Sequence, residues 1–249
     1  MLKGVLGVVL AGLMLLAAQV GAAAAFDPYS GSGYDYSYPQ CGSAAPSGLS
    51  FGIAGVNAGY PFTHYNSCLA TQYAAAAQTA NASLYINTGY DPSYAAVDGR
   101  HTEQDCATAS AQVNATAAQQ AAWAVGCSEA ERDVAYAASQ GATAPSAWWL
   151  DVETGNSWST TDLSLNRYTL DGLIGRLRSA TAVPVGIYST STQWNAITGG
   201  YRPAVDATWV ATGQRTAKRA RTACTAQSFT GAPIWLVQYL AAYDHDLAC

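Results

Sequence analysis

The sequence has few charged side chains: only 11% of its 249 residues are Asp, Glu, Lys or Arg, against about 25% in ordinary soluble domains. The net charge is −5, and the absence of a long basic run argues against a nucleic-acid partner. The one local basic cluster, Lys218-Arg219-Ala220-Arg221, is more typical of a solvated helix face than of a binding patch. Tyr (16) and Trp (7) are abundant instead, and this composition favours contact with sugars over contact with polyanions.

Motifs for metal and nucleotide binding are also missing. No CxxC or HxxxH spacing occurs, and the three histidines (His64, His101 and His245) are scattered, so we expect no metal site. No strand is followed by GxGxxG or GxxxxGK, which removes the usual nucleotide-binding motifs of an open parallel sheet. We therefore predict that the protein uses no cofactor.

The first 25 residues differ from the rest of the chain. Lys3 is the only charged residue among them, residues 5–20 are apolar, and Ala23-Ala24-Ala25 supplies small residues for a cleavage site. We interpret residues 1–25 as a signal peptide, because a retained membrane anchor, the alternative, would need a longer apolar core and a basic flank. No linker divides residues 26–249, which we expect to form one secreted, monomeric domain, extracellular or in the cell wall, without membrane contact.

Six cysteines follow the leader, at positions 41, 68, 106, 127, 224 and 249. An even number of cysteines in an exported chain implies disulfide bonds. The sequence alone does not choose among the many possible connectivities. We expect neighbours in sequence to pair: Cys41 with Cys68, Cys106 with Cys127, and Cys224 with Cys249.

Short strand-like runs alternate with alanine-rich helical stretches, a pattern typical of βα units around a parallel sheet. Strands are predicted at 34–37, 49–57, 83–87, 147–153, 183–189, 206–212 and 233–239, and helices at 68–79, 112–125, 128–140 and 163–179. Ser128 with Glu131 would form a capping box, and Asp162 would cap the last helix. Roughly seven or eight strands, the last few separated by little helix, predict an α/β fold: a single TIM-like β/α barrel, with an open doubly wound sheet as the alternative.

The run Trp149-Leu150-Asp151-Val152-Glu153 places two carboxylates two residues apart in an apolar stretch. In a strand, Trp149, Asp151 and Glu153 would share one face, and Leu150 and Val152 the other. Burying two carboxylates together costs several kcal/mol unless they are partnered or one keeps its proton. The pair therefore indicates chemistry. Two carboxylates cleave glycosides when one donates a proton to the leaving oxygen and the other stabilises or attacks the cationic carbon.

Other polar residues fall at predicted strand ends, where the reacting groups of a β/α barrel lie. These residues are Asp35, Asn57, Asn87, Tyr188 and Gln238, followed in the tail by Asp244 and Asp246. Their convergence on one rim would create an acidic, aromatic-lined cleft. Several of the candidate site residues have a structural alternative: Asp35 as a turn cap, the tryptophans Trp149, Trp209 and Trp235 as barrel packing, and Asn57 and Asn87 as hydrogen-bonding strand ends.

Five motifs, in order, resemble the glycoside hydrolase family 25 lysozymes. The run from Gly33 to Gln40 resembles that family's opening G-x-D-[VI]-S-x-x-Q, and Leu150-Asp151-Val152-Glu153 its central L-D-x-E strand. The remaining three are Gly186-Ile187-Tyr188-Ser189 for G-I-Y-[ST], Thr208-Trp209-Val210-Ala211 for L-W-[IV]-A with Thr208 in the leucine position, and Gln238-Tyr239 with Asp244-His245-Asp246-Leu247 for a closing Q-Y and late D-x-N. The resemblance spans nearly all of the chain after the leader.

The resemblance implies hydrolysis of the β-1,4 bond between N-acetylmuramic acid and N-acetylglucosamine in peptidoglycan. It implies that Glu153 is the proton donor and that Asp151, its partner, orients the substrate acetamido group or stabilises charge. Asp35 and Asp246 would be the remaining acids, with Asp246 preferred over Asp244 because Leu247 follows it. We predict that the substrate-binding residues are Asn57, Asn87, Trp149, Tyr188, Trp209 and Gln238. The nucleophile, an enzyme carboxylate or the substrate's acetamido oxygen, stays open.

The sequence also departs from that family. Gly55-Val56-Asn57-Ala58-Gly59 stands where the family has a strand ending in A-T-E-G, so an amide replaces an acid. Residues 91–127 carry two cysteines and a long insertion. These departures indicate a divergent branch. We expect a metal-free muramidase-type glycoside hydrolase acting on a polysaccharide; the alternative is a non-catalytic glycan-binding barrel at the cell surface.

Overall fold

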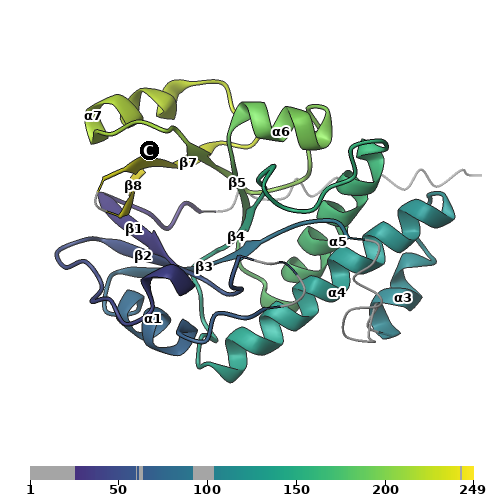
Figure 1. Cartoon of the computed structure of the whole chain (residues 1–249), viewed down its shortest axis with the longest axis horizontal. Helices are drawn as coiled ribbons and strands as arrows, with labels where there is room; N and C mark the ends of the chain where they lie inside the picture. Colours follow the sequence, from purple (N-terminus) through teal and green to yellow (C-terminus); the bar gives the residue numbers. More distant parts are fainter. Residues whose placement is uncertain (1–25, 60, 62–63, 92–103, 242) are drawn as a thin grey trace, which may run out of the picture.

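The computed structural model describes residues 26–59, 61, 64–91, 104–241 and 243–249, and the interpretation of residues 1–25 as a signal peptide lies outside them. Eight strands form a closed barrel (Figure 1). They are β1 (Ser32–Tyr36), β2 (Phe51–Gly55), β3 (Asn81–Asn87), β4 (Trp148–Asp151), β5 (Val185–Ser189), β6 (Ala207–Ala211), β7 (Ile234–Leu240) and β8 (Asp244–Ala248). The helices are α1 (Leu69–Ala76), α3 (Gln104–Ser110), α4 (Ala117–Ser139), α5 (Leu163–Thr181), α6 (Ser191–Thr198) and α7 (Ala217–Ala220), with 3-10 turns η1 (Tyr38–Gln40) and η2 (Arg221–Thr225).

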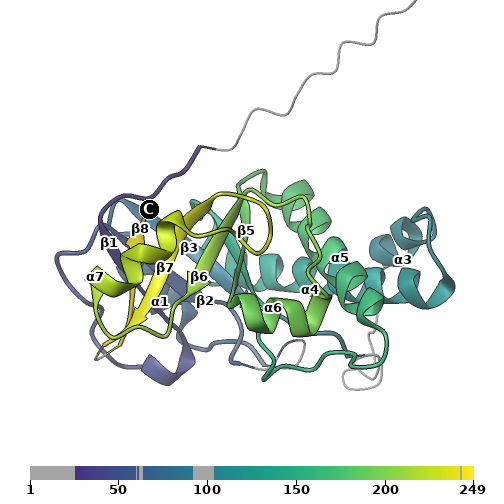
Figure 2. The ribbon, with the colours of Figure 1, turned by 90° about the horizontal axis from the view of Figure 1, so that it is seen from above.

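The predicted β/α barrel is confirmed. Strands β1 to β7 pair in parallel in sequence order, and only the short helices α6 and α7 separate the last parallel strands. Each of the seven predicted strands is present, with ends that differ by at most two residues. Helices α3, α4 and α5 lie on one side of the barrel and α7 on the opposite side (Figure 1, Figure 2).

The prediction that Asp244 and Asp246 lie in a tail is wrong, because both belong to β8. This strand runs antiparallel between β7 and β1 and closes the barrel. Aspartate is depleted in strands, which hid this one in the sequence. Because β8 enters from the carboxyl ends of the parallel strands, Asp244 lies nearer the mouth than Asp246, in register with Leu240 and Gln238 respectively.

The two faces predicted for residues 149–153 are confirmed. Trp149 packs inside the barrel against Trp209 of β6 and Trp235 of β7, with ring centroids 5.6 and 6.4 Å away. Leu150 and Val152 belong instead to the core between the sheet and the helices. The alternation therefore aims the carboxylates of this run into the barrel mouth and its aliphatic side chains at α4 and α5.

The helix prediction for residues 112–140 is only partly right. Residues predicted as two helices form the single helix α4, within which Ser128 is buried and donates its hydroxyl to Ala124 O at 2.7 Å rather than acting as a cap. The capping box is formed by Thr116 and Gln119. The predicted cap of α5 is confirmed, since the Asp162 side chain accepts from Ser164 N at 2.9 Å.

Helices α4 and α5 approach closely at two glycines. A Cβ on Gly172 would lie 2.0 Å from Trp123 O, and one on Gly126 would lie 1.9 Å from Thr169 O. A backbone atom cannot move aside as a side chain can, so we expect Gly172→Ala to lower the free energy of unfolding by about 3 kcal/mol. Urea denaturation would measure this.

Gly175→Ala, in the same helix, is the matched control for this prediction. The nearest atom to its added Cβ would be Trp123 Cζ2 at 3.8 Å, an ordinary contact. This variant should gain about 0.5–1 kcal/mol from helix propensity. Equal effects of the two substitutions would contradict the close approach of the helices.

The predicted disulfide pairing is confirmed at all three positions. Cys41–Cys68 ties the segment after β1 to the start of α1, Cys106–Cys127 joins α3 to α4, and Cys224–Cys249 joins η2 to the C-terminal residue. Among the helices of the described ranges, none combines the length and the hydropathy needed to span a membrane.

Candidate active site

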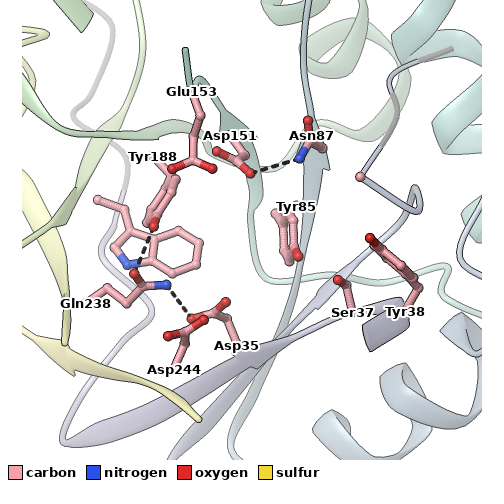
Figure 3. Close-up of a pocket in the computed structure, with 12 residues that line it drawn as sticks. Asp35, Ser37, Tyr38, Tyr85, Asn87, Asp151, Glu153, Tyr188, Gln238 and Asp244 are labelled. Atoms are coloured by element: carbon pink, nitrogen blue, oxygen red, sulfur yellow. Dashed lines mark hydrogen bonds between the residues drawn. The ribbon is translucent and has the colours of Figure 1, made fainter. Parts of the chain in front are cut away.

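A cavity of about 260 Å³ opens at the carboxyl ends of the parallel strands (Figure 3). It is lined by Asp35, Ser37, Tyr38, Gly59, Tyr85, Asn87, Asp151, Glu153, Tyr188, Trp209, Gln238 and Asp244. Seven of the ten residues predicted for the site are in this set. The barrel brings them together because a strand's last inward side chains face the mouth.

Asp151 closes β4 and is almost fully buried, at 7% exposure. Its Oδ2 accepts from Asn87 Nδ2 at 3.4 Å (Figure 3). Burial raises the pKa of Asp151 well above its usual range, and the charges of Glu153 and Asp35 add to this effect. Burial therefore favours the protonated form of Asp151.

Glu153 follows β4 by two residues and is partly exposed. Its carbonyl oxygen accepts from Trp158 Nε1 at 2.9 Å, which fixes the backbone beyond the strand end. Its side chain points into the cavity beside Asp151 and Tyr188 (Figure 3). The Oε1 atom accepts from Gln193 Nε2 at 3.4 Å.

Gln193, in the first turn of α6, was not predicted from the sequence. Its Oε1 accepts from Thr154 N at 2.6 Å and from Thr154 Oγ1 at 2.9 Å. Since a backbone N–H can only donate, the amide oxygen must face Thr154, and the NH₂ group must face Glu153. The sequence marks Gln193 only as the third residue after the helix cap Thr190, which accepts from Gln193 N at 3.1 Å, and this spacing does not indicate the contact with Glu153.

Asp35 lies on the opposite wall, near the end of β1. Its Oδ2 accepts from Gln238 Nε2 at 2.8 Å, and Gln238 Oε1 in turn accepts from Tyr188 OH at 2.8 Å (Figure 3). Burial, followed by the charge of Asp244, raises the pKa of Asp35 to about 7. The hydrogen-bonded chain thus links β5, β7 and β1 and ends on a carboxyl group that titrates near neutrality.

Asp246 does not line the cavity; Asp244, the rival for the late acid position, does. The Asp246 side chain is fully buried, and its Oδ1 accepts from Trp209 Nε1 at 2.9 Å. Burial, then the neighbouring Asp35, raises the pKa of Asp246 well above its usual range. Asp246 therefore lies beneath Asp35, one layer below the mouth, where burial favours its neutral form.

Asn57 and Trp149, which were predicted to bind substrate, also lie away from the cavity wall. Asn57 Nδ2 donates to Asn87 O at 2.8 Å, and its Oδ1 accepts from Asn87 N at 3.0 Å, so the side chain joins two strand ends. Trp149 is fully buried, and its Nε1 donates to Tyr29 OH at 2.8 Å. For both, the structure agrees with the structural alternative given by the sequence.

The sequence also missed Tyr38 and Tyr85, which face the cavity from the side opposite Glu153 (Figure 3). Tyr38 is 44% exposed at the rim, where an aromatic ring can stack on a sugar. Alternation in the predicted strand 83–87 places Tyr85 on the same face as Asn87, so a signal for Tyr85 was available, whereas nothing in the local sequence marks Tyr38. Among the residues that the structure describes, no group of three His, Cys, Asp or Glu side chains has an arrangement that could hold a metal ion.

Comparisons with known proteins agree with this geometry. The family model described as Lys-1, Lysozyme-like protein 1, matches residues 66–235. No curated protein is significantly similar to the chain in sequence.

Several solved structures share the fold. A muramidase from Trichobolus zukalii has a TM-score of 0.57 at 14% identity, covering 88% of this chain and 94% of that one. A lysozyme from Streptomyces coelicolor has 0.56 at 19%, covering 89% and 93%. A family 25 glycosyl hydrolase from Bacillus anthracis has 0.53 at 11%, covering 90% of both chains. At such identities the likeness shows a common barrel, and it confirms the family 25 resemblance at the level of the fold.

Proposed function

Because the chain belongs to the family described as Lysozyme-like protein 1, we propose that it is a muramidase-type glycoside hydrolase that cleaves β-1,4 bonds in peptidoglycan. The observation that carries the proposal is the cavity, where Asp151 and Glu153 face Asp35 and Asp244 across an aromatic-lined space (Figure 3). Glycoside hydrolases cleave the glycosidic bond with a pair of carboxyl groups that lie on two sides of it.

Glu153 is assigned as the general acid. It is the more exposed carboxyl group of the pair, and Gln193 holds its Oε1. This leaves Oε2 to carry a proton to the glycosidic oxygen as the bond breaks. Proton donation to a leaving alkoxide lowers the barrier because the sugar would otherwise depart as a strong base.

Asp151 is assigned as the group that orients the substrate acetamido group. Burial raises its pKa, which favours the neutral form over the negative charge with which it would attack the sugar. Asn87 fixes one of its oxygens by hydrogen bonding. A neutral carboxyl group held in this way can form directed hydrogen bonds with an amide.

Asp35 is assigned to stabilise the positive charge that develops on the sugar ring. Its pKa near 7 makes a substantial fraction ionised at neutral pH. The donor from Gln238, itself positioned by Tyr188, favours the ionised form. In this assignment Glu153 supplies the proton from one wall of the cavity, and Asp35 supplies the negative charge from the opposite wall.

We propose that the enzyme acts outside the cell, on peptidoglycan. Three disulfides support this, because such bonds form and persist in oxidising compartments. Incubation of the purified chain 26–249 with peptidoglycan tests the activity: we expect loss of turbidity together with new reducing ends, and no comparable release from chitin. Co-sedimentation without clearing would instead favour the glycan-binding alternative.

Gln193→Ala should lower kcat about tenfold and leave KM unchanged, because the lost donor positions Glu153 for the chemical step rather than holding the substrate. Steady-state rates on a soluble peptidoglycan fragment would measure both constants. Gln119→Ala, at the exposed start of α4, is the control and should change neither. A rise in KM at constant kcat would show that Gln193 binds substrate instead.

A further inference from the structure

Charge is distributed unevenly along this chain. No acidic residue occurs between Asp206 and Asp244, although the whole chain has 16 acidic and 11 basic residues. Four cations, Arg215, Lys218, Arg219 and Arg221, lie in the same interval within seven positions. We call these four residues the basic face.

The structure exposes all four side chains of the basic face. Ala217 and Ala220 of α7 pack against Val237 of β7 and Leu247 of β8, which turns the charged side chains of this short helix outward. Arg176 pairs with Glu131 and Arg178 with Asp206, whereas no residue of the basic face forms an ion pair within the part of the chain that the structure describes. Packing and ion pairing therefore leave these four cations without a structural role.

The basic face begins at the mouth of the barrel. Gln214, next to Arg215, accepts from Leu240 N at 2.8 Å, and Thr212 N donates to the carbonyl oxygen of Gln238 at 3.2 Å. Gln238 lines the cavity. From there the chain passes into α7, which lies beside β7 and β8 in both views (Figure 1, Figure 2).

The cavity itself is unsuited to anionic groups. Its lining includes four carboxyl groups and contains no Lys, Arg or His. A carboxylate on a bound polymer would be repelled at this short range in a partly buried site. Peptidoglycan nevertheless carries carboxylates on its peptide stems, so a strand threaded through the cavity needs cations outside it.

We propose that the basic face docks the carboxylate-bearing peptide stems of a peptidoglycan strand whose sugars occupy the cavity. The inference rests on the proposed function, because it assigns the stems of the same substrate. Each exposed contact is individually weak, but four neighbouring cations act together and attract a polyanion over about 10 Å at moderate ionic strength. The cavity would then bind the sugars of the polymer, and the basic face would bind its charged stems.

Replacing all four residues together (Arg215→Ala, Lys218→Ala, Arg219→Ala and Arg221→Ala) tests this. At low salt, kcat/KM on peptidoglycan should fall about tenfold, and 0.5 M salt should remove most of the difference from wild type. An amidase removes the stems and leaves one lactyl carboxylate on each muramic acid, held on the sugar rather than on a stem. On this stripped glycan, the variant and wild type should be equal. Arg202→Ala is the matched control: this exposed side chain lies next to Gly231, at the opposite, amino end of β7.

An equal loss on stem-bearing and stripped glycan, or no loss on either, would overturn the inference. So would a difference that disappears when wall phosphate polymers, rather than stems, are removed. Equal melting temperatures of variant and wild type confirm that the fold is intact. If the wild type releases no reducing ends, the proposed function fails, but co-sedimentation with the two glycans still decides the inference: it requires stem-dependent binding that the variant loses.

Discussion

Glu153→Gln is expected to reduce the release of reducing ends from peptidoglycan by about 10²–10⁴-fold, the contribution typical of a general acid. Glutamine has the same shape as glutamate but carries no transferable proton. The backbone at position 153 stays fixed by Trp158, and the new amide oxygen can still accept from Gln193. Binding to the wall should therefore survive, so a reducing-sugar assay and a co-sedimentation assay should give different answers.

Glu131→Gln is the control for this prediction, because it makes the same chemical change in a partly exposed ion pair that joins Glu131 of α4 to Arg176 of α5. Such a pair contributes about 0–1 kcal/mol, and activity should be unchanged. Unaltered turnover by Glu153→Gln would remove Glu153 from the acid role. Loss of both turnover and binding would indicate that Glu153 holds the substrate rather than protonating it.

The barrel could be predicted because its strands carry strong local signals. Alternation in residues 149–153 gave both faces of β4 correctly. Strand β8 could not be predicted in this way, since its aspartates are unfavourable in isolated strands and become acceptable only when β1 and β7 flank them. The single helix α4 was hidden by Ser128 and Glu131, whose spacing predicted a capping box within it. Gly126, close by, is required by the approach of Thr169 from α5.

Chain order was enough to predict which side chains lie at the mouth of the barrel, but not how deep each of them lies. Strand ends identify which side chains reach the mouth, and this placed Asp35, Asp151 and Glu153 correctly at the cavity. Depth inside the barrel depends on pairing register, so Asp246 could not be separated from Asp244 by sequence. Gln193 was missed for the same kind of reason, because its role depends on Thr154, which lies 39 positions away in the chain.

Asp35→Asn is expected to lower activity by about 10²-fold or more and, at the same time, to stabilise the protein at alkaline pH. Burial raises the pKa of Asp35 from the ordinary value of 3.8 to about 7. Between these values the unfolded chain releases the Asp35 proton while the folded chain keeps it. Folding stability contributed by the protonated group is therefore complete below pH 3.8 and is lost as pH rises to about 7.

The asparagine variant cannot lose stability in this way. The difference in free energy of unfolding between variant and wild type should therefore grow by up to about 4 kcal/mol from pH 4 to pH 8, since each pKa unit is worth about 1.36 kcal/mol. Urea denaturation at both pH values measures this change. Because the difference between variant and wild type is compared at two pH values, pH-independent effects of the new amide cancel, including its altered contact with the buried Asp246.

Asp162→Asn is the control, because the pKa of this exposed cap is lowered by its hydrogen bonds to Ser164. Its ionised form stabilises the fold, so any loss in this variant should appear at high pH, with the opposite sign to Asp35→Asn. A constant difference between Asp35→Asn and wild type at the two pH values would contradict the raised pKa. A carboxyl group kept only for structure would not weaken the fold as it ionises, so a variant that is more stable at pH 8 and less active would identify Asp35 as an acid retained for its chemistry.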